Sequence, residues 1–394
     1  MELAKQILQK AEEYKNYTAK NLSTLIKHKS LSCQEKEVAA DIKKIMEEAG
    51  FDEVKIDGLG NVIGRLGNGK KIIAIDGHID TVDLGNLDAW EFDPLGGEIK
   101  DGYVLGRGTT DQTGGPVAAI TAGRILKELG LGNDVTLYVT ATVMEEDCDG
   151  LCWRYIVEED KIRPDVVIVT EPTNLNIYRG HRGRMEIEVS FYGLSAHGSA
   201  PERGKNAIYM ASKAALEIEK LNERLAEDPF LGKGSVTISE FVSSSPSLCA
   251  VSDFAKIHLD RRLTWGENKE LALNEVKSIV EGMNAKVELL QYEETAYTGL
   301  KYGMEKYYPT WKIEEDHPVI QTGVKAFKEL FNQDPVVDKW TFSTNGVTIN
   351  GIYKIPVIGF GPGNEELAHA PNEKVPIEHL IKASAFYAMF VLKY

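Results

Sequence analysis

Three short apolar runs constrain the fold of this chain of 394 residues more than any other feature. The runs IIAID (72–76), VTLYV (135–139) and VVIV (166–169) show little polar alternation, which is typical of strands buried on both faces of a parallel sheet. The segments around and between them have helical spacing, at residues 2–26, 33–50 and 115–129. We therefore expect an α/β fold with a mostly parallel sheet and helices on both of its faces.

The pattern changes at about residue 181. Residues 184–192 (RMEIEVSFY) alternate strictly between polar and apolar side chains, which predicts a half-exposed strand. A helix, two strands, a helix and a strand are predicted to follow, at residues 205–226, 235–242, 253–263, 267–283 and 285–292. This β-α-β-β-α-β order is typical of a small ferredoxin-like α+β sheet.

The chain then returns to α/β character, with helical patterns at 317–332 and 376–392 and a strand at 355–360. The simplest interpretation is one domain of residues 1–180 and 294–394, with a second domain of residues 181–293 inserted into it. The strand at 184–192 is predicted to lie at a free sheet edge, where two copies of the chain can pair. We therefore expect a homodimer that forms through the inserted domain.

The composition argues against several classes of function. The formal charge is −15 and the pI is near 5.2, whereas nucleic-acid binding needs clustered Lys and Arg. No apolar run approaches the roughly 20 residues that span a bilayer, and the first helical segment lacks the apolar core of a signal peptide. Four cysteines in so long a chain do not resemble a disulfide framework. We expect a cytoplasmic protein that binds neither nucleic acid nor membrane.

Histidine and acidic residues follow the points where the predicted strands end. His78 comes two residues after IIAID, and Glu171 directly follows VVIVT. The pair Glu145–Glu146 follows VTLYVTA, and His369 lies in the loop GPGNEELAHAPNE after the last predicted strand. Because ligands bind outside the carboxyl ends of the strands in open α/β sheets, these side chains are expected to converge.

These residue types suit a divalent metal centre. Imidazole and carboxylate without thiolate are good ligands for zinc, manganese or cobalt. Such a metal acidifies water, and an adjacent carboxylate that is not a ligand can take the proton, so Glu145 and Glu146 offer one residue for each task. Each residue also has an ordinary interpretation: paired glutamates often lie on a solvated surface, Glu171 before a proline can belong to a turn, and Asp111 can cap a helix.

Seven segments of the chain resemble one superfamily of dinuclear zinc hydrolases, that of aminoacylase, carboxypeptidase G, acetylornithine deacetylase and succinyl-diaminopimelate desuccinylase. In chain order they are DGHIDTVDLGNLDAWEFDP, GYVLGRGTTDQTGG, TVMEEDCDG, VTEPT, GLSAHGSAPERGKNAI, DRRLTWGE and GFGPGNEELAHAPNE. The resemblance covers nearly the whole chain. It implies a zinc-peptidase type of catalytic domain and an inserted domain that serves as a lid and in dimerisation.

The resemblance also implies a ligand set for two divalent ions per subunit, most often zinc, with cobalt and manganese as alternatives. Asp111 matches the carboxylate that bridges both ions. The remaining ligands would be His78 and Glu171 for the first ion, and Glu146 and His369 for the second.

Four further residues match catalytic or binding positions of the superfamily. Glu145 matches the general base, and Asp80 matches the residue that orients the first ligating histidine. His197 matches a histidine that stabilises the oxyanion, which the partner subunit supplies in dimeric relatives. Arg262 matches an arginine that binds a substrate carboxylate. From the local sequence alone, His197 can equally be a polar loop residue, and Arg262 can form a surface ion pair with Asp260.

The closest resemblance, carried by EEDCDGLCW and GRGTTDQ, is to the selenium-metabolism-linked hydrolase subgroup. Two features depart from the wider pattern. Thr113 stands where many relatives have lysine, and the pair Cys148 and Cys152 is not a general family feature. Buried, inert thiols are the favoured interpretation of this pair, with a redox pair or an extra metal handle as alternatives.

The function expected from this resemblance is hydrolysis of an amide bond in an N-acyl amino acid or a short peptide. A di- or tripeptidase or aminopeptidase would use the same metals and base, so the ligand set does not separate the two. A catalytically inactive binding protein on the same fold is the alternative from another class. A serine hydrolase or nucleotide enzyme is disfavoured, because GLSAH lacks the second glycine of a nucleophile elbow and no phosphate-binding loop is present.

Overall fold

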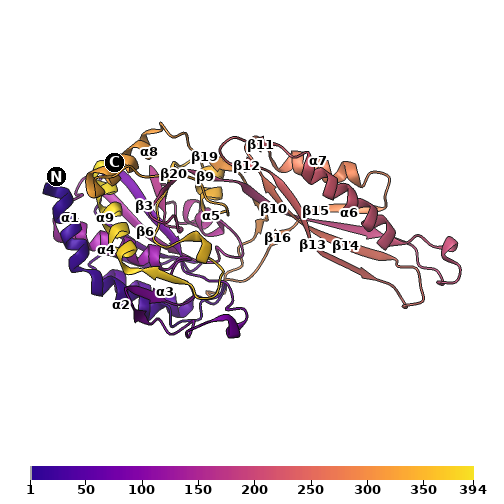
Figure 1. Ribbon diagram of the computed structural model, residues 1–394, viewed down its shortest axis with the longest axis horizontal. Coiled ribbons are helices and arrows are strands. Elements are labelled where there is room, and N and C mark those ends of the chain that lie inside the picture. Colours follow the sequence, from indigo (N-terminus) through magenta and orange to yellow (C-terminus); the bar gives the residue numbers. More distant parts are fainter. Residues whose placement is uncertain (1) are drawn as a thin grey trace.

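The computed structural model describes residues 2–394, which form two parts of unequal size, each built on its own sheet (Figure 1). The larger part contains an eight-stranded sheet with the order β1-β2-β6-β3-β7-β21-β8-β20, and the smaller part contains a five-stranded sheet. Each part also has its own cluster of buried apolar side chains. The N- and C-terminal ends lie on the larger part, and the smaller part projects away from it (Figure 1).

The sheet of the larger part is mostly parallel, as predicted. Its strands are β1 (Glu53–Ile56), β2 (Val62–Leu66), β3 (Lys71–His78), β6 (Val135–Thr142), β7 (Val166–Val169), β8 (Ile177–Tyr178), β20 (Val337–Asp338) and β21 (Val357–Gly359). β3 pairs in parallel with β6 and β7, and β7 pairs in parallel with β21. β6 and β7 are buried along nearly their whole length, as expected of strands covered on both faces.

The helices of the larger part are α1 (Glu2–Glu13), α2 (Lys15–Leu25), α3 (Lys36–Glu48), α4 (Gly114–Glu128), α5 (Leu151–Glu158), α8 (Pro318–Phe331) and α9 (Ile377–Lys393). α4 packs on α9 and contacts β3 and β6. A Cβ atom on Gly77 of β3 would meet Pro116 of α4, whereas the neighbouring Asp76 is hydrogen-bonded to Asn345. Because successive side chains of a strand point to opposite faces, both faces of the sheet are covered. The helix predicted over 2–26 is interrupted at Tyr14.

The smaller part has the predicted β-α-β-β-α-β order. Its elements are β10 (Gly183–Tyr192), α6 (Ala207–Glu223), β13 (Ser235–Ser244), β14 (Phe254–Leu263), α7 (Lys269–Ile279) and β15 (Ala285–Leu289). The apolar positions of β10 are fully buried, at Met185, Ile187, Val189 and Phe191. A further short strand, β18 (Tyr307–Tyr308), comes from beyond residue 293 and pairs with β10.

One prediction about this sheet is wrong. The strand at 184–192 does not lie at an edge, because β10 pairs with β14 on one side and with β15 on the other. The outer strand next to β14 is β13, whose polar and apolar side chains are largely exposed. Strict alternation identifies a strand with one buried face, but it does not distinguish a central strand from an edge strand.

Short elements complete the chain. They are the strands β4 (Ile99–Lys100), β5 (Tyr103–Leu105), β9 (Gly180–His181), β11 (Glu227–Asp228), β12 (Gly232–Lys233), β16 (Gln291–Tyr292), β17 (Met304–Glu305), β19 (Trp311–Lys312) and β22 (Lys374–Pro376), and the helical turns η1 (Leu87–Ala89), η2 (Pro201–Arg203), η3 (Val347–Ile352) and η4 (Glu365–Leu367). Across residues 2–394, no helix combines the length and the apolar character needed to cross a membrane.

Candidate metal centre

A cavity of about 270 Å³ lies where the carboxyl ends of β3, β6 and β7 meet. His78 is the last residue of β3, Glu145 and Glu146 follow β6, and Glu171 follows β7. The lining residues are His78, Asp111, Glu145, Glu146, Asp149, Glu171, Arg184, Arg262, Phe342, Ser343, Glu365, Ala368 and His369. All five residues expected to be metal ligands therefore lie in one cavity, together with Glu145.

Asp111 occupies the centre of this group. Its Oδ1 lies 3.0 Å from Nε2 of His78, and its Oδ2 lies 3.3 Å from Nε2 of His369. The Nε2 atom of His369 is also 2.9 Å from Oε2 of Glu146. The two oxygens of Asp111 thus face two different imidazoles, which is the arrangement that a bridging carboxylate requires.

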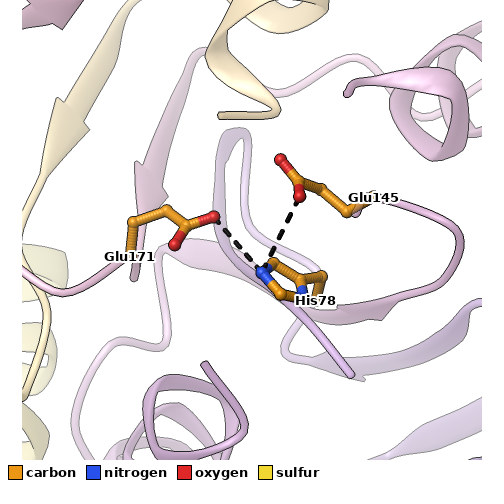
Figure 2. A group of neighbouring side chains, drawn as sticks. All are labelled: His78, Glu145 and Glu171. Atoms are coloured by element: carbon orange, nitrogen blue, oxygen red, sulfur yellow. Dashed lines mark ion pairs between the residues drawn. The ribbon is translucent and has the colours of Figure 1, made fainter. Parts of the chain in front are cut away.

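Glu145 and Glu171 flank His78 on two sides (Figure 2). The Nε2 atom of His78 lies 3.5 Å from Oε1 of Glu171 and 3.8 Å from Oε2 of Glu145. Two groups of side chains have ligand atoms within 4.8 Å of one another: His78 with Glu145 and Glu171, and His78 with Asp111 and Glu146. By distance alone, Glu145 is therefore as well placed for a cation as the expected ligands are.

Three buried carboxylate oxygens of this group have no hydrogen-bond partner among residues 2–394: Oε1 of Glu145, Oε1 of Glu146 and Oε2 of Glu171. An unpaired buried oxygen of this kind is costly in a folded protein. With Asp111, the group has four carboxylates, whose four negative charges equal in number the four positive charges of two divalent cations. The donor set, which consists of imidazole and carboxylate groups, fits divalent ions such as zinc, cobalt or manganese.

The pKa values of the group show the same excess of negative charge. Burial raises the pKa of Glu146 to about 7 and raises the pKa values of Glu145 and Glu171 well above the usual range. Hydrogen bonds to Asp111 and Glu146 raise the pKa of His369 to about 10. Burial opposes the charge of Asp111, but the two neighbouring imidazoles hold its pKa below the usual range. Burial and mutual repulsion therefore disfavour the charged forms of Glu145, Glu146 and Glu171.

Asp80 holds the loop that presents Glu145 and Glu146. Its Oδ1 accepts a hydrogen bond from the backbone N–H of Glu145 at 3.2 Å, and its Oδ2 accepts one from that of Glu146 at 3.0 Å. The Nδ1 atom of His78 lies 2.9 Å from the backbone carbonyl oxygen of Asp80 and 3.5 Å from its carboxylate. The backbone of Asp80 is therefore the nearer partner of the histidine, and its carboxylate serves the glutamate pair.

Two arginines line the cavity from the smaller part of the molecule. Arg262 of β14 lines the cavity and donates to both carboxylate oxygens of Asp260, at 2.8 and 2.9 Å. The ion pair with Asp260 is therefore confirmed, and binding of a substrate carboxylate stays a prediction. Arg184 lies opposite Arg262 in the register of β10 and β14, and it donates to Asp149 at 3.1 Å. Arg184 was not predicted as a site residue, because its position in the alternating strand predicts a solvent-facing side chain.

His197 lies outside the cavity. It follows the far end of β10, and Arg184 and Tyr192 at the two ends are eight residues apart, which is about 26 Å along an extended strand. The His197 side chain is exposed, and its Nδ1 accepts a hydrogen bond from the N–H of Ser199 at 3.1 Å. In the neutral ring, Nε2 is then the donor.

Glu35 is a buried carboxylate that was not predicted from the sequence. Its Oε1 accepts hydrogen bonds from the N–H groups of Met144 and Cys33, both at 3.0 Å. Met144 directly precedes the glutamate pair and has a left-handed backbone, with φ of 61°.

Cys148 and Cys152 are both buried, and burial raises their pKa values, as expected of inert thiols.

Comparison with known proteins identifies relatives along the whole chain. Residues 74–393 match Peptidase family M20/M25/M40. The uncharacterized protein YgeY of Escherichia coli (strain K12) is 51% identical over 392 residues, which cover 99% of this chain and 97% of that protein. A probable succinyl-diaminopimelate desuccinylase of Staphylococcus epidermidis is 27% identical over 388 residues, which cover 89% of this chain and 91% of the relative.

Solved structures show the same fold. Aminopeptidase PepT from Bacillus cereus superposes with a TM-score of 0.74 at 23% identity, covering 96% of this chain and 98% of that structure. The YXEP protein of Bacillus subtilis, described as a dinuclear metal-binding peptidase of the M20 family, has a TM-score of 0.71 at 16% identity, with 97% and 98% coverage. The family match and the 51% identity confirm the superfamily resemblance: this chain belongs to Peptidase family M20/M25/M40 and is a metallohydrolase of that family.

Proposed function

We propose that this protein hydrolyses an amide bond of an N-acyl amino acid or a short peptide at a centre of two divalent ions. Asp111 is the bridging ligand, His78 and Glu171 complete one site, and Glu146 and His369 complete the other. The observation that carries this proposal is the cavity in which these five side chains meet, with unpaired carboxylate oxygens buried beside them. Divalent ions at such a centre acidify water and polarise the scissile carbonyl.

Glu145 is the general base in this proposal. Its Oε1 is buried without a hydrogen-bond partner among the described residues, and Asp80 fixes its backbone. A carboxylate in this position takes a proton from the attacking water and delivers it to the leaving nitrogen. Arg262, which lines the same cavity, binds a substrate carboxylate.

The second subunit of a homodimer supplies His197 in this proposal. His197 is separated from the cavity of its own chain by the length of β10, so its Nε2–H can stabilise an oxyanion only in the site of another subunit. The dimer would pair through β13, the outer strand next to β14. A cavity of about 640 Å³ between α6 and β13, lined by both polar and apolar side chains and with Phe241 and Leu216 exposed at its wall, supports this surface.

The test is a screen of N-acyl amino acids and free-amine peptides against protein reconstituted with zinc, cobalt or manganese. We expect turnover of at least one amide substrate by the wild type. We expect Glu145→Gln to keep both ions and to lose about 10²–10⁴-fold in kcat, the usual contribution of a general base. Preference for acylated over free-amine substrates separates a deacylase from a peptidase. If the metal-loaded wild type turns over no amide, the binding-protein alternative is favoured.

A further inference from the structure

One buried ion pair joins the loops that carry Asp111 and His369. Arg107 lies four residues before Asp111, and Glu373 lies four residues after His369. The Nη1 atom of Arg107 lies 2.7 Å from Oε2 of Glu373, and it also donates to the carbonyl oxygen of Ala370 at 3.2 Å. The side chains of Arg107 and Glu373 are 3% and 0% exposed. The loop of the bridging ligand and the loop of a terminal ligand are therefore tied together by one guanidinium group.

The other oxygen of Glu373 reaches the backbone of the bridging ligand. Oε1 of Glu373 accepts hydrogen bonds from the N–H groups of Thr110 and Asp111, at 2.8 and 3.0 Å. Two donors on one carboxylate oxygen fix the orientation of the peptide group before Asp111. Hydrogen bonds to a charged acceptor are about twice as strong as neutral ones, and burial keeps water from competing for them. Glu373 thereby constrains where the Asp111 carboxylate can lie.

Neighbouring contacts reinforce this connection. The backbone N–H of Gly106 donates to the carbonyl oxygen of Glu373 at 3.0 Å, and Oγ1 of Thr110 donates to the carbonyl oxygen of Lys374 at 2.9 Å. The Trp90 ring covers the guanidinium of Arg107, with 5.1 Å between the Cζ atom and the ring centroid. The proposed reaction uses neither Arg107 nor Glu373, and neither side chain lines the cavity.

We propose that Arg107 and Glu373 are positioning residues that fix the spacing of Asp111 and His369 and thereby set the affinity for the ion between Asp111, Glu146 and His369. This inference rests on the proposed dinuclear centre. Of the two residues that Arg107 and Glu373 position, only Asp111 would also bind the ion held by His78 and Glu171. The affinity for that ion therefore depends less strongly on Arg107 and Glu373. Loss of a residue that supports metal ligands typically weakens binding about 10- to 100-fold.

The informative variant is Glu373→Gln. An amide has one acceptor oxygen and one N–H2 group, whereas Glu373 accepts hydrogen bonds on both sides, from Arg107 and from the backbone. Glutamine therefore leaves two donors facing each other on one side. The matched control is Glu267→Gln in the smaller part. The pair Arg261–Glu267 is equally buried, at 1% and 3% exposure, and Glu267 also accepts from a backbone N–H, that of Thr264, at 2.7 Å.

The experiment titrates metal-free protein with Co²⁺ and with Zn²⁺, followed by calorimetry and by the Co²⁺ absorption spectrum, beside thermal unfolding of each variant. The wild type is expected to bind two ions. Glu373→Gln is expected to bind the ion between Asp111, Glu146 and His369 about 10- to 100-fold more weakly than the wild type does. Glu267→Gln is expected to lose thermal stability and to bind both ions as the wild type does. Arg107→Lys is the second variant, for use if Glu373→Gln does not fold. Lysine keeps the charge but has a single ammonium with shorter reach, so we expect an intermediate loss of affinity.

If folded Glu373→Gln or Arg107→Lys binds each ion as tightly as the wild type does, the inference is overturned and the proposed function stays in place. A loss of affinity in Glu267→Gln as large as that in Glu373→Gln would also overturn the inference, because the effect would then reflect general destabilisation. A wild type that takes up no divalent ion would overturn both the proposed function and the inference.

Discussion

Replacement of Asp80 with asparagine tests whether this carboxylate holds the Glu145–Glu146 pair in place. Asp80 accepts three hydrogen bonds, from the backbone N–H groups of Glu145 and Glu146 and from Oγ of Ser32, at 3.2, 3.0 and 2.7 Å. Asparagine has one acceptor oxygen, so at least one buried backbone N–H loses its acceptor. Because a hydrogen bond to a charged group contributes about 1.5–3 kcal/mol, we expect Asp80→Asn to lower the free energy of unfolding by about 2–3 kcal/mol.

If the lost hydrogen bond is the one that places Glu145, we expect the activation free energy of the reaction to rise by the same amount. Each 1.4 kcal/mol is a factor of about ten, so kcat/KM is expected to fall about 30- to 150-fold. Urea unfolding of the metal-free proteins, followed by circular dichroism, measures the first quantity, and the rate on an amide substrate from the screen measures the second. Ser32→Ala is the control, because it removes the hydroxyl donor and leaves both backbone hydrogen bonds. A variant Asp80→Asn that unfolds at the wild-type midpoint and keeps its activity would refute this reasoning.

Three further predictions concern metal, pH and assembly. Removal of the ions by a chelator is expected to lower Tm, because each ion at 100 times its Kd stabilises the native state by about 2.7 kcal/mol; an unchanged Tm in a thermal scan would contradict this. Burial raises the pKa of Asp57 from its usual value of 3.8 to about 7, so between these pH values the folded chain holds a proton that the unfolded chain lacks. Stability is therefore expected to fall as pH rises from about 4 to 7, by at most about 4 kcal/mol, and denaturant titrations should show a smaller slope in Asp57→Asn. Phe241→Glu, at the exposed edge of β13, is expected to give a monomer by light scattering, while Ile99→Glu in the larger part leaves the assembly unchanged; a dimeric Phe241→Glu would exclude β13 as the interface.

The convergence of the expected ligands was predictable because it depends on the strand pattern. Apolar runs such as 135–139 and 166–169 are long enough to identify buried parallel strands, and parallel strands bring their carboxyl ends to one edge. His78 is the last residue of β3, Glu146 and Glu171 lie four and two residues after β6 and β7, and the structure places all three in one cavity. The edge position of β10 was not predictable, because strand order depends on pairing between segments that are distant along the chain.

Glu35 and Glu373 were not predicted from the sequence, and Asp80 was found only through the family resemblance, for a physical reason. Glu35, Asp80 and Glu373 all accept hydrogen bonds from backbone N–H groups, and every residue except proline carries such a group. A sequence therefore offers no partner residue to search for, and an isolated glutamate is usually taken to be a solvated side chain. Arg184 was not predicted for a different reason. Its strand predicts a polar outward face, and only the packing of the two parts of the molecule converts that face into a wall of the cavity.

Five buried carboxylates of this site differ in how many of their oxygens accept hydrogen bonds. Glu145, Glu146 and Glu171 each keep an oxygen without a hydrogen-bond partner among residues 2–394, whereas both oxygens of Asp80 and of Glu373 are occupied by donors. A carboxylate with a free buried oxygen can bind a cation or take a proton. One that is saturated with N–H donors has no such capacity and can only hold the chain in place. This difference separates the three glutamates from Asp80 and Glu373. Glu35 combines both features, because its Oε1 accepts two backbone N–H donors and its Oε2 has no partner among residues 2–394.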